Sequence, residues 1–224
     1  MEEEQLEQDL VNADTDLVTI TIGGNDALFL NVVTHCATNL FPSNNCLDEI
    51  VSGGTQTWRD YVRNRIETHV KTRVANVLQE IVALTQGNAT VVLLGYPLLV
   101  SDATNCAAPG FNNLGAPGVS RDERIALREL GLFLNAHLAT AAAEVGVHFV
   151  RVAERFEGHN VCDSVPLIKG VVLGEDDKHW FHPNIDGQLA YAGELEEFFR
   201  DTATVSYPRG YFESGMPRNP APAP

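Results

Sequence analysis

The stretch that decides the fold is Leu17-Val18-Thr19-Ile20-Thr21-Ile22-Gly23-Gly24-Asn25-Asp26. Its first six residues form an apolar and β-branched run, and two glycines follow directly. A continuous run of this kind is typical of a strand buried in a parallel sheet, and paired glycines allow the sharp turn at which such a strand ends. The sequence therefore predicts a buried strand at residues 17–22, with a polar turn at its carboxyl end.

Further strands alternate with long helices along the chain. Apolar runs predict strands at residues 90–94 and 147–152, and helical spacing of apolar residues predicts helices at residues 58–84, 120–145 and 188–200. This alternation is typical of an α/β fold, in which βαβ crossovers place helices on both faces of a parallel sheet. In such a fold, any site is expected at the carboxyl ends of the strands.

Capping residues support two of these helices. Ser120 and Glu123 have the spacing of a capping box, in which each side chain binds the other residue's backbone N–H. Gly87 and Gly146 follow the last apolar residues of the helices at 58–84 and 120–145, where glycine is favoured as a terminator. We therefore expect well-defined ends for both helices.

Composition indicates one globular domain and excludes some partners. The chain has 224 residues, 44% of them hydrophobic, and a formal net charge of -15. Such a surface repels nucleic acid and anionic membranes, whereas neutral or uncharged substrates remain open. No apolar run approaches the roughly 20 residues of a membrane-spanning helix. We expect the domain at residues 1–200, followed by a Pro- and Gly-rich tail at residues 201–224.

Four cysteines favour disulfides over a metal or redox site. Cys36, Cys46, Cys106 and Cys162 contain no C-x-x-C pair, which argues against zinc and thiol redox chemistry. Three pairings are open, and the alternative is four buried thiols in a reducing compartment. The chain begins with an acidic segment, unlike a secretory leader. Disulfides would indicate an oxidising compartment, yet the first residues do not resemble the leader of an exported protein. We therefore expect that residues that once preceded Met1 are absent.

Two polar segments carry residues suited to acyl transfer. The amide of Asn25 follows a strand end, where it can donate to a developing oxyanion; the alternative is an ordinary turn that uses Asn for its backbone preference. His182 precedes Pro183, which restricts its backbone, and a histidine is the usual general base for a serine nucleophile. The other histidines outside this segment are interpreted as structural: His35, His69, His137, His148 and His159.

These segments together resemble blocks III and V of the SGNH/GDSL hydrolases, namely Gly23-Gly24-Asn25-Asp26 after a strand and His182-Pro183-Asn184 before the last helix. Gly95-Tyr96-Pro97 and the segment around Cys162 resemble the secreted actinomycete-like branch. The resemblance covers residues 5 to 200.

The resemblance implies a flavodoxin-like α/β/α sandwich that hydrolyses carboxylic esters or lipids without a cofactor or metal. A serine would be the nucleophile, His182 the base and Asn25 an oxyanion donor, with Gly24 beside the substrate. It also implies export to the outside of the cell. Together with the expected loop positions of the cysteines, it predicts two disulfides: Cys36 with Cys46, and Cys106 with Cys162.

The chain departs from this family in its nucleophile. No Gly-Asp-Ser occurs in it, and only 22 residues precede Gly23, too few for blocks I and II. We therefore expect the nucleophilic serine to lie outside this chain. Ser164 is a weak replacement, because no strand precedes it and no helix follows it. The alternative is a catalytically inactive SGNH-fold fragment or binding module.

A second departure concerns the third member of the triad. The family's acid normally lies three residues before the histidine, where this chain has His179. The backbone carbonyl of His179 is the predicted substitute, and Asp176 or Asp177 is less favoured. A metal site at His179 and His182 is disfavoured, because a loop H-x-x-H lacks the helical spacing of known zinc motifs.

The absent blocks also have a structural consequence in this interpretation. In the family they contribute two strands of a five-stranded sheet, so residues 17–22 would form a bare edge. An unpaired edge is a template for pairing with another chain. We therefore predict self-association through this edge, and low stability, for the chain alone.

Overall fold

Three parallel strands form the sheet at the centre of the molecule. The computed structural model describes residues 6, 10–38, 45–101, 119–161, 163–170 and 180–204. The strands are β1 (Leu17–Ile20), β2 (Thr90–Leu94) and β3 (His148–Val150), and the sheet order is β1-β2-β3. Both pairs are parallel, as predicted, and Ile20 is opposite Leu93 while Leu94 is opposite Val150. The carboxyl ends of all three strands therefore meet at one edge.

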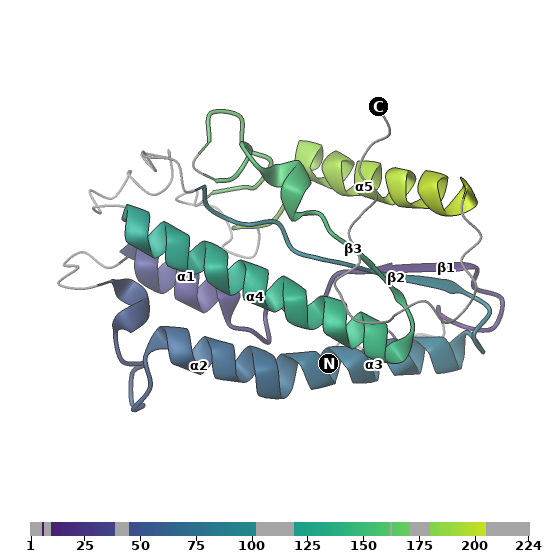
Figure 1. The fold of residues 1–224 in the computed structure, drawn as a ribbon, viewed down its shortest axis with the longest axis horizontal. Coiled ribbons are helices and arrows are strands. Elements are labelled where there is room, and N and C mark those ends of the chain that lie inside the picture. The colour runs from purple at the N-terminus through teal and green to yellow at the C-terminus, as the bar shows by residue number, and fades with distance from the viewer. Residues whose placement is uncertain are drawn as a thin grey trace.

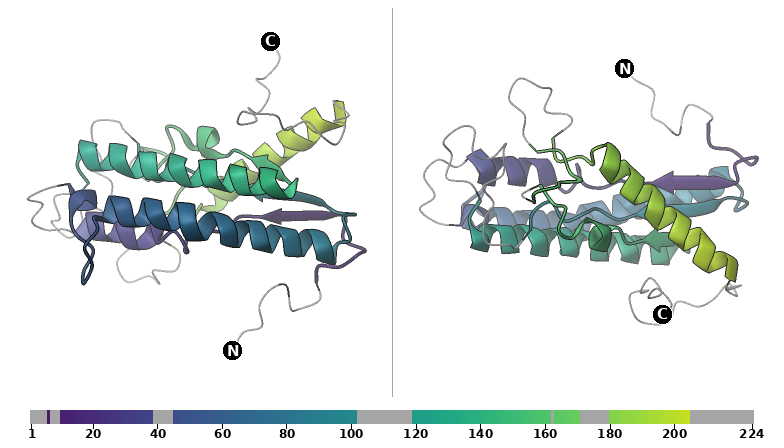
Figure 2. Two further views of the ribbon diagram at one scale, coloured as in Figure 1. Left: turned by 60° about the horizontal axis from the view of Figure 1, so that its bottom comes forward. Right: turned by 90° about the horizontal axis from the view of Figure 1, so that it is seen from above.

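Helices cover the sheet on two sides (Figure 1). On one side α3 (Lys71–Leu84) and α4 (Arg121–Val145) pack against the sheet, and α2 (Trp58–Arg65), which precedes α3, lies beyond the strands. On the other side, α5 (Ile185–Thr204) crosses the strands, as Figure 2 shows. No helix in the described part of the chain is long and apolar enough to span a membrane. The chain thus has the α/β architecture expected from its sequence.

The predicted helix at residues 58–84 is continuous but not uniform. A π-helical turn (Ile66–Val70) joins α2 to α3, and its buried residues Ile66 and Val70 face the core. At the far end of α3, the N–H of Gly87 binds the carbonyl of Val82, and Gly87 has φ +72°. Helix α3 ends at Leu84, as predicted, but its C-cap is Thr85 and not the expected Gly87, because the chain already turns left-handed at Gln86. The π turn was not predicted, because wider turns leave little trace in apolar spacing.

The second predicted helix begins and ends as its sequence indicates. Ser120 caps α4 and forms the reciprocal capping box with Glu123, and Gly146 follows it in the left-handed conformation. Glu123 also accepts a hydrogen bond from the backbone N–H of Cys46, at 2.9 Å. One carboxylate therefore fixes both the start of α4 and the segment at Cys46, which explains why this acidic side chain is buried.

The core lies between β2 and the helices. Residues 91–94 are buried, whereas Leu17 of β1 is 46% exposed. The cause is position: β2 is central, and among the described residues β1 pairs only with β2. The predicted self-association through this edge remains a prediction.

One disulfide is confirmed. Cys36 and Cys46 are bonded, with 5.1 Å between their Cα atoms. Their predicted loop location was wrong, because Cys36 lies in a helix, α1 (Phe29–Thr38), and Cys46 begins a 3-10 helix (Cys46–Asp48). Helix α1 forms because its apolar residues recur at helical spacing and bury Val32, Val33 and Cys36. Cys106 and Cys162 lie outside the described residues.

Candidate active site

A pocket of about 370 Å³ opens at the carboxyl ends of β1 and β2. Its lining comes from four parts of the chain: the end of β1 with the following turn and α1, the segment after β2, one face of α4, and the start of α5 with the residues before it. The lining residues are Thr21, Gly24, Asn25, Phe29, Leu30, Tyr96, Pro97, Leu99, Gly131, Leu134, Trp180, Phe181, His182, Pro183, Gln188 and Tyr191. Asn25 and His182, which are far apart in sequence, therefore share one cavity.

The turn that carries Asn25 is fixed from the helix side. Gly23 has φ +104°, and a Cβ there would lie 3.0 Å from Val70, so this position requires glycine. Next to Asn25, Asp26 is held twice: Arg65 Nε donates to its carbonyl oxygen, and Arg73 Nη1 donates to its carboxylate at 2.6 Å. Both arginines come from the helix that contains the π turn. The amide of Asn25 thus projects from an anchored turn into the pocket.

His182 is oriented by a main-chain carbonyl. Its Nδ1 lies 2.9 Å from the carbonyl oxygen of Trp180. A carbonyl can only accept, so Nδ1 carries the proton of the neutral ring and Nε2 keeps its lone pair. Between these residues, Phe181 has φ +60°, a left-handed conformation that is rare for aromatic residues and that folds the chain back on itself. Strain of this kind tends to persist where it positions functional groups.

The segment of His182 is also held by a short antiparallel contact. Lys169 N–H donates to the carbonyl of His182, and Phe181 N–H donates to the carbonyl of Lys169, each at 2.8 Å. Phe181 is 9% exposed and packs into the core. These contacts offset the backbone cost at Phe181 and hold the exposed imidazole at the rim of the pocket.

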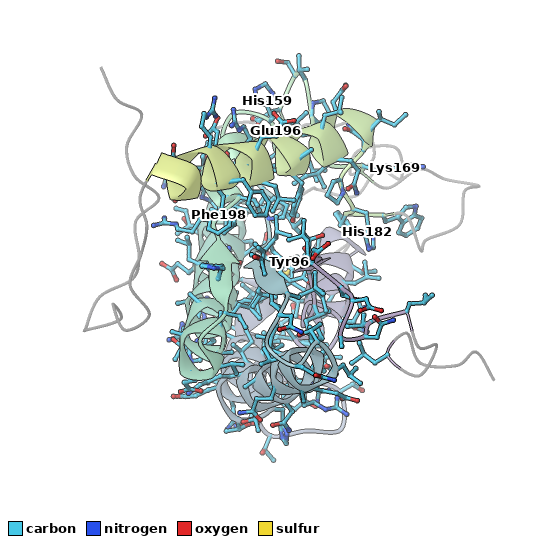
Figure 3. The ribbon with its side chains drawn as sticks, turned by 90° about the vertical axis from the view of Figure 1, so that its right-hand side faces the viewer. Tyr96, His159, Lys169, His182, Glu196 and Phe198 are labelled. Carbon is cyan, nitrogen blue, oxygen red and sulfur yellow. A yellow bond between two sulfur atoms is a disulfide. The ribbon has the colours of Figure 1, made fainter. Side chains whose placement is uncertain are left out.

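Two tyrosine hydroxyls lie near the end of β2. Tyr96 belongs to the segment after this strand, and Tyr191 belongs to α5. Tyr96 accepts a hydrogen bond from Gly24 N–H at 3.0 Å, and Tyr191 donates to the carbonyl of Gly95 at 3.0 Å. Burial raises the pKa of both hydroxyls, so both stay protonated at neutral pH. In Figure 3, Tyr96 and His182 both lie below α5, and both line the pocket.

The other residues predicted from the sequence differ in whether they line the pocket. His179, Asp176 and Asp177 lie outside the described residues. Ser164 is exposed and does not line the pocket. None of the five histidines interpreted as structural lines it either: His35, His69, His137, His148 and His159. Gly24 does line it, but its N–H already binds Tyr96.

Sequence reasoning missed several pocket groups. The Trp180 carbonyl, the Tyr191 hydroxyl and the Thr21 hydroxyl had no assigned role, and Tyr96 served only as part of a resemblance. The position of Tyr96 directly after a buried strand was a signal that could have found it, because strand ends meet at the site. Among the described lining residues there is no serine or cysteine.

The start of α5 depends on a glycine, which gives a test of how the His182 segment is held. A Cβ at Gly187 would collide with the carbonyl oxygen of Leu167 and lie 2.9 Å from Pro183. We expect Gly187→Ala to lower the free energy of unfolding by about 2 kcal/mol, the usual cost of overpacking. Urea unfolding measures this change.

The matched control is Gly193→Ala in the same helix. A Cβ there would meet only the flexible guanidinium of Arg155, at 3.7 Å. Alanine is a better helix former than glycine by about 1 kcal/mol, so this variant should be as stable as the parent or more stable. Equal losses in the two variants would contradict the packing of residues 167 and 187.

The chain is similar in sequence to a known family of proteins. A family model described as GDSL-like Lipase/Acylhydrolase matches residues 1–190. A curated lipase from Streptomyces rimosus is 32% identical over 178 residues, which are 80% of this chain and 58% of that protein. The chain therefore spans little more than half the length of this relative.

Two solved structures are similar along most of the chain. The crystal structure of an extracellular lipase from Streptomyces rimosus matches with a TM-score of 0.68 and 30% identity, covering 83% of this chain and 70% of the other. That of a phospholipase A1 from Streptomyces albidoflavus matches with a TM-score of 0.67 and 26% identity, covering 84% and 70%.

Proposed function

The chain belongs to the GDSL-like lipase/acylhydrolase family, and on this premise we propose that its pocket hydrolyses carboxylic esters of lipid-like substrates. The observation that carries the proposal is His182, whose Nδ1 is bound to the Trp180 carbonyl in the same cavity as Asn25. This arrangement leaves a basic Nε2 and an amide donor at one pocket, which are the two groups that acyl transfer needs besides a nucleophile.

The proposed mechanism assigns one step to each group. Nε2 of His182 accepts the proton of a serine hydroxyl while the serine oxygen bonds to the ester carbonyl carbon. The Asn25 amide donates to the oxyanion that forms. When the intermediate collapses, the bond to the alkoxide breaks and His182 returns the proton to that alkoxide. Water then releases the acid by the same steps.

The apolar part of the pocket supports an acyl chain as the bound group. Phe29, Leu30, Leu99 and Leu134 contribute hydrophobic surface to the same pocket as Asn25. The net charge of -15 disfavours anionic head groups, so neutral esters are the substrates we propose.

We also propose that the protein acts outside the cell. The bond between Cys36 and Cys46 supports this, because disulfides form and persist in oxidising compartments. A further support is the Streptomyces rimosus relative, which is described as an extracellular lipase.

A second candidate function is acyl binding without hydrolysis. It is favoured by the absence of a Gly-Asp-Ser sequence from the 224 residues and of serine or cysteine from the described pocket lining. In this case the pocket would hold an acyl group, with Asn25 bound to its carbonyl, and His182 would have no proton to accept.

Hydrolysis of nitrophenyl butyrate distinguishes the two functions. We expect turnover by the complete natural polypeptide that contains these residues, with loss of turnover after treatment with a serine-reactive fluorophosphonate. The chain of residues 1–224 alone should be silent. Turnover that resists the reagent would contradict the serine mechanism, and no turnover in the complete polypeptide would favour the binding module.

A further inference from the structure

We propose that Tyr96 is a further catalytic residue of this site, whose hydroxyl donates a second hydrogen bond to the ester carbonyl oxygen alongside the Asn25 amide. This inference rests on the proposed function, because it requires an ester in the pocket. It adds a donor that lies on the segment after β2, whereas Asn25 lies on the turn after β1.

The first observation is the position of the hydroxyl beside Asn25. Tyr96 Oη accepts a hydrogen bond from the backbone N–H of Gly24, the residue that precedes Asn25, at 3.0 Å. Contact this close requires glycine: a Cβ at Gly24 would lie 2.9 Å from Cζ and 3.0 Å from Oη of Tyr96. The turn is therefore built to admit a phenol, and the hydroxyl and the Asn25 amide approach the pocket from neighbouring positions.

The second observation concerns the proton of this hydroxyl. A tyrosine hydroxyl accepts and also donates, and here the Gly24 N–H occupies an acceptor site of the oxygen. Among the described residues no acceptor for the Tyr96 proton is found. Tyr96 lines the pocket together with Asn25 and His182, so a bound oxygen in that pocket can take the proton. The hydroxyl oxygen is already paired with the Gly24 N–H, and an ester carbonyl oxygen would accept its remaining proton.

The third observation is that Tyr96 is held in place before any ligand arrives. The side chain of Asn135 on α4 binds the Tyr96 backbone twice: Oδ1 accepts from its N–H and Nδ2 donates to its carbonyl, both at 2.8 Å. A donor fixed in advance costs no reorganisation when charge develops on the substrate, which is the condition for strong oxyanion stabilisation.

The charge around the hydroxyl supports donation as well. Burial, aided by the nearby carboxylate of Asp26, raises the pKa of Tyr96, while the Gly24 N–H opposes this shift. The hydroxyl therefore keeps its proton at neutral and mildly alkaline pH and remains a donor there.

Tyr191 provides a matched control in the same pocket. Its hydroxyl is also buried, but it already donates to the carbonyl of Gly95 at 3.0 Å. Its proton is therefore used within the protein. Tyr96→Phe and Tyr191→Phe each remove one oxygen from the pocket wall, yet only the first removes a proton that a ligand could receive.

The test uses 2-octanone with a ¹³C-labelled carbonyl, a neutral ligand that binds without being hydrolysed. The carbonyl resonance moves downfield as its oxygen accepts hydrogen bonds. We expect a downfield shift on binding to the chain, a smaller shift in Tyr96→Phe, and the full shift in Tyr191→Phe. Loss of one hydrogen bond should also weaken binding to Tyr96→Phe about three- to tenfold.

The outcomes separate this inference from the function it rests on. A full shift in Tyr96→Phe with a reduced shift in Asn25→Ala overturns the role of Tyr96 and leaves Asn25 as the donor. Full shifts in both variants, or no binding to the parent chain, overturn the proposed acyl site and the inference with it. If Tyr96→Phe does not fold, uniform labelling with 3-fluorotyrosine in the Tyr191→Phe background replaces it. The more acidic phenol should move the resonance further downfield, and an unchanged resonance would overturn the proposal.

Discussion

His182→Ala should abolish ester hydrolysis, with kcat reduced by about 10⁴-fold or more, the usual loss when the general base of a serine hydrolase is removed. Without the imidazole, no group in the described pocket lining has a basic nitrogen to accept the serine proton. The measurement is the initial rate of nitrophenyl butyrate hydrolysis by the complete natural polypeptide, with and without the substitution.

His159→Ala is the control for this variant. Like His182, His159 has its Nδ1 on a main-chain carbonyl, that of Val165 at 2.8 Å, but it does not line the pocket. Its removal should leave kcat within a small factor of the parent value. Comparable losses in both variants would mean that the His182 effect comes from folding, and near-normal turnover without His182 would remove it from the mechanism.

Asn25→Ala is expected to lower kcat by about 10²- to 10³-fold, the range reported for loss of one oxyanion donor. The amide acts on charge that is present only in the transition state, so KM should change little. The side chain is exposed and lines the pocket, so thermal unfolding should be almost unaffected. Parallel measurements of kcat, KM and the midpoint of thermal unfolding test all three expectations.

Asn25→Asp refines this test. The carboxylate has nearly the shape of the amide but accepts hydrogen bonds and repels the oxyanion. It should therefore lose at least as much activity as alanine at neutral pH. Retained activity in Asn25→Asp would show that the side chain acts by filling space, and would contradict its assignment as a donor.

The parts of the fold that sequence could predict are those set by neighbouring residues. The strand at residues 90–94 was predicted with its observed bounds, and the capping box of Ser120 and Glu123 fixed the start of α4, because both depend on local patterns. Helix α5 begins three residues before the prediction, at Ile185, where the Asn184 side chain accepts from the N–H of Gly187. Helix α1 was missed although its apolar residues recur at helical spacing, because at 10 residues it offers only a short stretch of that pattern.

The site shows the same division. Asn25 and His182 could be predicted because glycine or proline marks the end of a strand or the start of a helix beside each of them. The ends of parallel strands meet at one edge of the sheet, where sites form. The bond between Tyr96 and Gly24 joins residues 72 positions apart, and the Trp180 carbonyl reaches His182 only through the left-handed backbone of Phe181. Contacts of these kinds depend on how the elements pack, so no local pattern reports them.

The π turn between α2 and α3 bears on which insertions and deletions the chain tolerates. An α-helix turns by about 100° per residue. In a regular α-helix, the separation of eight positions between Arg65 and Arg73 would leave these side chains roughly 80° out of line, whereas a separation of seven would align them to within about 20°. The wider turn at Ile66–Val70 takes up the extra residue, and both arginines reach Asp26. Deletion of the exposed Glu67 should therefore convert the π turn to α-helix and keep both halves in register. Deletion of the equally exposed Gln79 would rotate the part of the helix on one side of the deletion against the core and unfold that part.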